Sequence, residues 1–188
     1  MPRIFDNIEL SFLPTLQESL RTAKKADFCV GYFNLRGWKE ISSHIDSWQG
    51  GEENCCRLMV GMQSAPQEEL RKFFSLINQQ ELDQSTVIRR KKEIASSFKD
   101  QLTFGVPTNE DEKALRQLSE QIKAKKVVVK LFLKHQLHAK LYLVHRNDHN
   151  NPTIGFVGSS NLTFAGLSKQ GELNVDVLDE TSCEKLQK

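Results

Sequence analysis

The chain has 188 residues, of which 38% are hydrophobic and 27% are charged, and its formal net charge is +2. This length is enough for one domain with a sizeable core, and the composition excludes a disordered chain. No apolar run reaches the length of a membrane span, and the N-terminal residues do not form a signal peptide. We therefore expect one cytoplasmic domain over residues 1–188, which could be the N-terminal part of a larger protein.

Hydrophobic periodicity predicts alternating helices and strands in the first half of the chain. In chain order these are a helix at 12–25, a strand at 28–33, a helix at 37–48, a strand at 57–62, and helices at 70–77 and 87–98. Asn109 and Glu112 resemble a capping box that begins another helix. Four closely spaced strands follow, at 127–133, 137–144, 153–157 and 172–178. Short loops imply some antiparallel pairing, so we predict an α/β fold with a mixed β-sheet sandwiched between helices.

The four cysteines are Cys29, Cys55, Cys56 and Cys183, and none forms a C-x-x-C pair. We interpret them as buried thiols. His135 and His138 have H-x-x-H spacing, but no cysteine or carboxylate stands in register to complete a zinc site. We therefore expect neither a metal nor another cofactor.

The strand predicted at 137–144 carries two polar residues that suit an anion site. His138 and Lys140 are two residues apart, so in a strand they share one face. The next strand ends at Gly158-Ser159-Ser160-Asn161, where glycine permits close approach and free N–H groups attract phosphate. Glu172 begins the following strand. Its carboxylate could accept a hydrogen bond from one ring nitrogen of His138, which leaves the other nitrogen free to attack.

In this order, these residues resemble the HKD motif of the phospholipase D superfamily, written H-x-K-x4-D-x6-G-S-x-N. His145 stands where the motif has Asp, and the next Asp is Asp148. A weaker resemblance covers residues 28–38, which look like phospholipase D-like domains of the kind fused to helicases or restriction enzymes. The resemblance implies a phospholipase D-like fold with one HKD motif, and cleavage of phosphodiesters through a covalent phosphohistidine.

The same resemblance implies a role for each matching residue. His138 would be the nucleophile, Lys140 and Asn161 would hold phosphate oxygens, Ser159 would assist, and Glu172 would orient the histidine. In the family, the motif Asp supports the site rather than performing the chemistry. We assign further substrate contacts to Gly158, Ser160, Lys130 and Lys134.

Basic residues are clustered although the net charge is small. Residues 121–147 contain no Asp or Glu and lead into the motif, and a second basic cluster stands at 89–92. This distribution favours a polyanionic substrate. We expect a metal-independent nuclease whose partner is nucleic acid, DNA in the first instance. A phospholipid phosphodiesterase or phosphatidyl transferase is one alternative, although no amphipathic anchor indicates a membrane partner. A non-catalytic nucleic-acid-binding module of a helicase is the other.

The chain holds a single H-x-K copy. In the family that it resembles, one histidine attacks and a second protonates the leaving oxygen, supplied by a tandem copy or by a dimer. We therefore expect a homodimer whose shared active site lies on the two-fold axis. The internal alternatives are His44, His135, His145 and His149, none of which has the supporting pattern.

Overall fold

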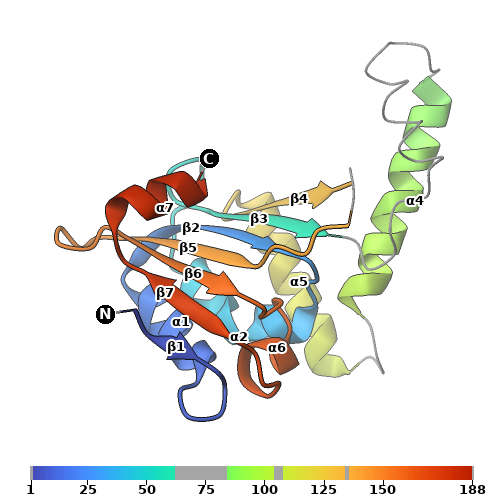
Figure 1. Cartoon of the computed structure of the whole chain (residues 1–188). Coiled ribbons are helices and arrows are strands. Elements are labelled where there is room, and N and C mark those ends of the chain that lie inside the picture. The colour runs from blue at the N-terminus through green and yellow to red at the C-terminus, as the bar shows by residue number, and fades with distance from the viewer. Residues whose placement is uncertain (1, 62–83, 104–107, 134–135, 188) are drawn as a thin grey trace.

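The computed structural model describes residues 2–61, 84–103, 108–133 and 136–187. Its strands form one sheet in the order β1-β7-β6-β5-β2-β3-β4 (Figure 1). The strands are β1 (Ile4–Phe5), β2 (Ala23–Val30), β3 (Cys56–Gly61), β4 (Val127–Phe132), β5 (Leu141–Arg146), β6 (Thr153–Gly158) and β7 (Asn174–Val177). The helices are α1 (Phe12–Arg21), α2 (Leu35–Asp46), α4 (Gln84–Leu102), α5 (Asn109–Lys123), α6 (Phe164–Ser168) and α7 (Glu180–Gln187).

The sheet is mixed, as predicted. β2, β3 and β4 are parallel neighbours, and helices lie in the connections between them, because a parallel pair needs a long crossover. β5, β6, β7 and β1 each run antiparallel to their neighbours. The short connection between β5 and β6 permits only this arrangement.

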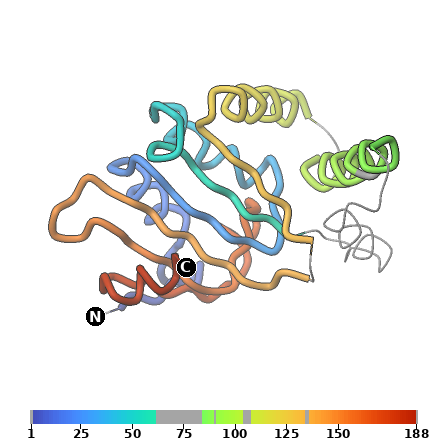
Figure 2. Tube along the Cα trace, turned by 90° about the horizontal axis from the view of Figure 1, so that it is seen from above, coloured from blue at the N-terminus to red at the C-terminus, as the bar shows by residue number. Residues whose placement is uncertain are grey.

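Helices lie on both faces of the sheet, which confirms the predicted fold class. Figures 1 and 2 show α1, α2 and α5 on one face, and α6 packs against α1 and α2. On the other face, α7 packs on β6 and β5. Among the described helices, none has both the length and the apolar character that crossing a bilayer requires.

Strand alternation decides which side chains enter the main core. In β2, Ala26, Phe28 and Val30 are buried towards α1 and α2, while Asp27 and Cys29 lie on the opposite face. Full burial of a side chain such as Phe28 contributes about 1.5–3 kcal/mol. The four cysteines are free, and all but the half-buried Cys29 are buried, which agrees with their interpretation as buried thiols.

Several strand ends meet at one edge of the sheet. Leu141, the first residue of β5, pairs with Cys29 near the end of β2 and with Val157 near the end of β6. Gly158, which ends β6, pairs with Asn174, which begins β7. The parallel strands β3 and β4 also end here. We call this row of strand ends, which lies at the right of the sheet in Figure 1, the site edge.

Several predicted boundaries were wrong. The strand predicted at 28–33 runs from Ala23 to Val30 as β2, and the helix predicted at 87–98 runs from Gln84 to Leu102 as α4. The helix predicted at 12–25 ends at Arg21, because the chain from Ala23 onward pairs with β5 and then with β3. The strand predicted at 137–144 begins only at Leu141, and the strand predicted at 172–178 begins at Asn174. In both strands, the motif residues lie in the segment just before the sheet.

Other differences concern helix starts and short elements. Thr108 and Asp111, rather than Asn109 and Glu112, form the capping box of α5. β1, α6 and α7 were not predicted, because elements of two, five and eight residues are too short to show a clear period. The helix predicted at 70–77 lies outside the described residues.

Candidate active site

His138 and Lys140 lie in an irregular segment directly before β5. His138 is exposed, and Lys140 is half-buried. Lys140 Nζ donates a hydrogen bond to the His138 carbonyl over 2.7 Å, and the Lys140 carbonyl accepts one from the Gly158 amide over 3.2 Å. The backbone of Lys140 is therefore tied to the end of β6, while the imidazole of His138 is left accessible to solvent.

The segment after β6 is held against the start of β7. A Cβ atom on Gly158 would lie 2.2 Å from the Leu173 carbonyl oxygen, so only glycine fits there. The Ser159 amide donates to the same carbonyl over 3.0 Å, and the Leu173 amide donates to Ser159 Oγ over 2.9 Å. The hydroxyl of Ser159 thus joins β6 to β7 at the site edge.

Ser160 lies in the protein interior and not on the surface where a substrate contact was predicted. Its side chain is fully buried, and its hydroxyl accepts a hydrogen bond from Asn174 Nδ2 over 2.7 Å. Its carbonyl accepts one from the Tyr142 hydroxyl over 2.9 Å. The prediction that Ser160 contacts substrate is therefore corrected, because its side chain faces the interior and is satisfied there.

Asn161 is held by the loop that follows β2. The Tyr32 amide donates to Asn161 Oδ1 over 2.9 Å, which leaves the Nδ2 group as the donor available for another partner. A Cβ atom on Gly31 would lie 2.5 Å from the Leu137 carbonyl and 3.3 Å from Asn161 Oδ1. Gly31 therefore lies where the segment before His138 and the segment after β6 approach one another.

Glu172 precedes β7 and is half-buried. Glu172 belongs to the same cluster as the end of β6, because the next residue, Leu173, is hydrogen-bonded to Ser159. Burial and, second, the negative charge of Glu172 raise the pKa of Tyr142 well above its usual value. Between the described residues Glu172 and His138, however, the predicted hydrogen bond is not formed.

The remaining predicted substrate contacts are Lys130 and Lys134. Lys130 is exposed on β4, opposite Met59 of β3, and three strands separate it from β6 in the sheet order. Lys134 and His135 lie outside the described residues. Within the described ranges, no group of three or more His, Cys, Asp or Glu side chains is placed to hold a metal ion.

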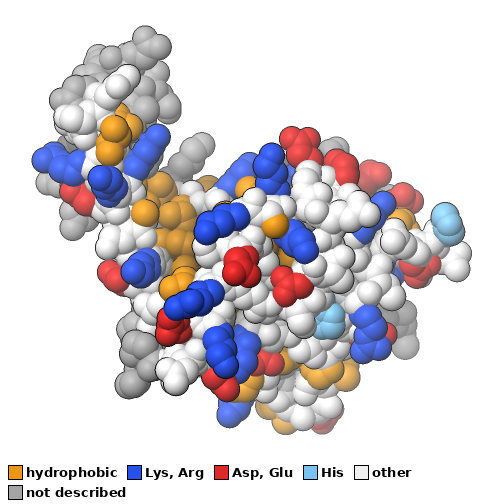
Figure 3. Space-filling view, turned by 180° about the vertical axis from the view of Figure 1, so that it is seen from behind, with side chains coloured by type: hydrophobic (Ala, Val, Ile, Leu, Met, Phe, Trp, Pro, Cys, Tyr) orange, Lys and Arg blue, Asp and Glu red, His pale blue; other side chains and the backbone are white. Residues whose placement is uncertain are grey.

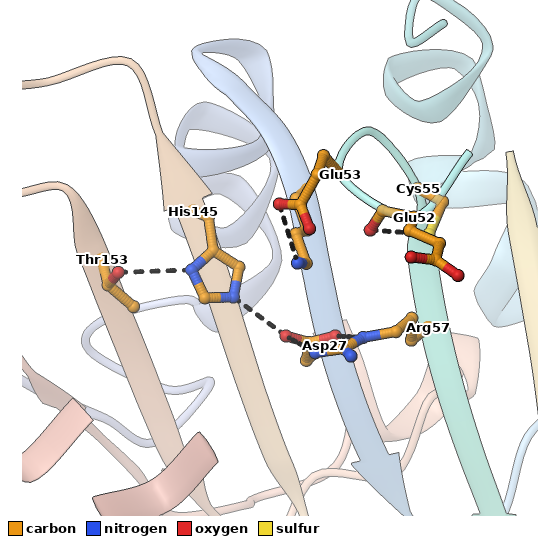
Figure 4. A network of polar contacts seen from close by, with 8 residues as sticks. Asp27, Glu52, Glu53, Cys55, Arg57, His145 and Thr153 are labelled. Carbon is orange, nitrogen blue, oxygen red and sulfur yellow. Dashed lines mark hydrogen bonds and ion pairs between the residues drawn. The ribbon is translucent and has the colours of Figure 1, made fainter. Parts of the chain in front are cut away.

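His145, at the motif's Asp position, lies far from the site edge. It pairs with Lys25 at the start of β2 and with Thr153 at the start of β6. Its Nε2 lies 2.9 Å from Asp27 Oδ2 and its Nδ1 lies 3.3 Å from Thr153 Oγ1 (Figure 4). Asp27 also accepts hydrogen bonds from Arg57. A carboxylate on the neighbouring strand β2 thus accompanies the histidine that replaces the motif Asp.

This network determines the ionisation of Asp27. Burial acts to raise the pKa of the Asp27 carboxyl, but hydrogen bonds and charge from His145 and Arg57 outweigh burial and lower the pKa to about 2. Arg57 and Asp27 form an ion pair across β2 and β3. The polar row in Figure 4 therefore stabilises the sheet far from His138.

A cavity that the sequence did not predict lies beside Asn161. It has a volume of about 390 Å³, and its lining residues are Tyr32, Asn34, Arg36, Asn161, Thr163, Phe164, Ala165 and Gln170. One sequence feature could have indicated this region: Asn34 is a residue type that favours helix N-caps. In the structure its side chain accepts a hydrogen bond from the Gly37 amide over 2.9 Å, so α2 begins beside the cavity.

Comparisons with known proteins identify the family and the fold. A family model described as "Cardiolipin synthase, PLD-like domain" matches residues 56–188. The chain is similar in structure to NucT from Helicobacter pylori, with 11% identity and a TM-score of 0.54, over 100% of this chain and 91% of that one. It is also similar to Nuc, a phospholipase D family member from Salmonella typhimurium, with 11% identity and a TM-score of 0.52, over 100% of this chain and 89% of that one. A search of curated protein sequences found no match.

The family match spans more than half of the chain and includes His138, Lys140, the segment after β6, and Glu172. At 11% identity the solved structures show the shared fold. The chain therefore belongs to the phospholipase D superfamily, as a PLD-like domain.

Proposed function

We propose that this protein is a metal-independent phosphodiesterase that cleaves nucleic acid through a covalent phosphohistidine. The observation that carries the proposal is the meeting of three segments at the site edge: His138 with Lys140, Gly158 to Asn161, and Glu172. An exposed imidazole is accessible to a phosphodiester. The ammonium of Lys140 and the free amide group of Asn161 offer donors to its non-bridging oxygens.

In the proposed reaction, a ring nitrogen of His138 attacks phosphorus as the bond to the leaving oxygen breaks, and a general acid protonates that oxygen. Water then attacks phosphorus, the phosphorus–nitrogen bond breaks, and the conjugate base of the acid takes the proton of the water. Lys140 and Asn161 stabilise the charge on the non-bridging oxygens in both steps.

The general acid is proposed to come from a second copy of the chain. His145 and His149 lie at the far end of β5 and in the loop after it, which Figure 1 shows opposite the site edge. His44 lies in the last turn of α2, where burial and then the charge of Arg21 lower its pKa. These three histidines, which are the described internal alternatives for the general acid, therefore lie away from His138. His138 of the partner copy would supply the acid in a homodimer with a shared active site.

Two observations bear on the substrate. Nucleic acid is favoured because the segment free of Asp and Glu, residues 121–147, leads into the site. Phosphatidyl transfer is the second candidate, because the matching family model is described as a cardiolipin synthase domain. Both reactions break a phosphodiester, so the chemistry at His138 is common to them.

Incubation of the purified protein with labelled plasmid and single-stranded DNA in excess EDTA tests the proposal. The same preparation is incubated with anionic phospholipid vesicles, and His138→Ala protein is the matched control. We expect nicked or cut DNA in EDTA from the wild type and none from the folded variant. Release or transfer of lipid headgroups without DNA cleavage would establish the second candidate. DNA binding without cleavage would indicate a non-catalytic module.

A further inference from the structure

Helix α4 reaches the site edge only at its C-terminal end. Gln101 Nε2 donates to the Gly61 carbonyl over 3.3 Å, and the Tyr32 hydroxyl donates to the Gln101 carbonyl over 3.3 Å. The Phe98 ring lies 6.2 Å from that of Phe33. α4 has no extensive packing with any other described element, and Figures 1 and 2 show its N-terminal turns projecting beyond the sheet.

The projecting helix carries more basic than acidic side chains. Arg89, Lys92 and Lys99 follow one another at spacings of three and seven residues, so they line one stripe. The exposed Glu93 and Asp100 lie beside Arg89 on the same side, and Lys91 lies on another side. Ile94 and Phe98, which are buried and half-buried, lie on the opposite side of the helix. The three basic side chains are exposed, and none of them makes an ion pair within the described part of the chain. Figure 3 shows Lys and Arg side chains along this helix.

The stripe makes little net contribution to helix stability. Arg89 and Lys92 are like charges one turn apart, which destabilises a helix by a few tenths of a kcal/mol, and Glu93, four residues after Arg89, offsets a similar amount. The last turn of the same helix is fixed to Tyr32, whose amide holds Asn161. The stripe is therefore attached to the loop that positions a proposed phosphate ligand, and an anionic chain that enters the site can continue along it.

We propose that α4 is a binding arm for the phosphate backbone of a long polynucleotide, on the segment that flanks the cleaved phosphodiester. Its 19 residues span about 28 Å at roughly 1.5 Å per residue. The part that carries the basic side chains, from Arg89 to Lys99, extends about 15 Å, which corresponds to about four base pairs at about 3.4 Å each. The arm deepens the proposed function and rests on it, because it assigns the substrate to long nucleic acid rather than to a small diester or a lipid.

The arm is tested by reversing its charge. The arm variant is Arg89→Glu with Lys92→Glu. The matched control is Lys24→Glu with Lys185→Glu, which makes the same change in net charge at exposed positions at the start of β2 and on α7, outside α4 and outside residues 121–147. Each pair is also made with His138→Ala, so that binding is measured without cleavage. Circular dichroism checks that all the variants are folded.

Three readouts separate the arm from the active site. Fluorescence anisotropy gives the affinity for a labelled 20-base-pair duplex as a function of salt, where we expect the arm variant to bind about tenfold more weakly and its salt slope to fall by about two. Cleavage of a long DNA should slow to a similar degree, and turnover of bis(p-nitrophenyl) phosphate should be unchanged. The control variant should follow the wild type in all three.

The outcomes distinguish the two proposals. Equal DNA affinity and salt slope in the arm and control variants would overturn the arm and leave the nuclease intact. If no preparation cleaves either phosphodiester, the nuclease fails, and the anisotropy of the duplex still decides the arm. Loss of binding to phosphatidylserine vesicles with unchanged DNA binding would assign the stripe to a membrane and overturn the proposal.

Discussion

The motif side chains divide by exposure. His138 is exposed and Lys140 is half-buried, whereas Ser160 is fully buried and satisfied by Asn174 and Tyr142. The difference arises because His138 and Lys140 lie in the segment before β5, which is open to solvent, while Ser160 follows β6 and packs against the start of β7. The residues of one motif therefore have two kinds of role: some are accessible to a ligand, and others stabilise the core.

Lys140 gives the sharpest test of a single side chain. Lys140→Ala should lower kcat on DNA by about 10²–10³, since loss of a donor to the transition-state oxygens has this effect. Lys140→Arg should retain part of the rate because the positive charge remains. Steady-state kinetics on a labelled oligonucleotide measures both, with Lys24→Ala at the opposite edge as the control. A folded Lys140→Ala protein with unchanged kcat would remove the lysine from the mechanism.

Asp27 predicts a specific pH dependence of stability. Its folded-state pKa of about 2 is lower than its ordinary value of 3.8, so the carboxylate stabilises the fold above about pH 4, and this contribution is lost as the pH falls through about 2. It amounts to about 1–2 kcal/mol. Urea unfolding between pH 6 and about pH 2 should therefore show a shallower acid decline in Asp27→Asn than in the wild type.

The control for this measurement is Asp100→Asn. Asp100 is exposed on α4 and makes no ion pair among the described residues, so its replacement should leave the acid decline unchanged. Identical declines in the wild type and in Asp27→Asn would show that the network with His145 and Arg57 does not contribute in this pH range.

At the scale of elements, the site edge depends on close backbone approach. The loop after β2 is joined to the segment after β6 by the pairing of Phe33 with Leu162 and by the hydrogen bond from Tyr32 to Asn161. Gly31 lies between this segment and the Leu137 carbonyl, which directly precedes His138. The relative position of His138 and Asn161 is therefore set by a loop that belongs to neither motif piece.

Gly31→Ala should disturb this position. The added Cβ would lie 2.5 Å from the Leu137 carbonyl oxygen, so the backbone before His138 must shift. A displacement of about 1 Å at a reacting group can lower the rate by about 10². We expect kcat to fall by about tenfold or more and the free energy of unfolding to fall by about 1–3 kcal/mol. Gly171→Ala is the matched control, because a Cβ there meets no atom within 4 Å. Equal kcat values for the two variants would contradict the proposed constraint.

At the scale of the whole molecule, one chain offers one H-x-K copy at its site edge, and the described alternatives His44, His145 and His149 lie away from it. The proposed chemistry needs an acid as well as a nucleophile. We therefore expect a second copy of the chain to complete the site by supplying the acid.

Sedimentation velocity should give a dimer under the conditions of activity. In addition, wild-type protein exchanged with a fourfold excess of His138→Ala protein should lose activity per wild-type chain to about one fifth, because most wild-type chains then sit in mixed dimers with one histidine. Independent sites would retain full activity per wild-type chain. An active monomer would overturn the shared site and direct attention to an acid within the chain.

The sequence by itself determined the fold class and the family, and it supplied the candidate residues of the site. Alternation in the strands and the order of His138, Lys140, Gly158 to Asn161 and Glu172 carried these predictions, because side-chain period and motif spacing are local properties of the chain. Strand boundaries at the motif were wrong, since polar residues at a strand end have the same alternation whether or not they pair with a neighbour.

Only the tertiary structure decided which of these residues face solvent and which are used to hold the fold. It buried Ser160, placed Lys130 across the sheet, and put His145 beside Asp27 at the opposite edge from His138. It also brought Gly31 and Tyr32 to Asn161 and attached α4 to them. These contacts join residues that are distant in sequence, and they follow from strand order and register, which the local pattern of side chains does not encode.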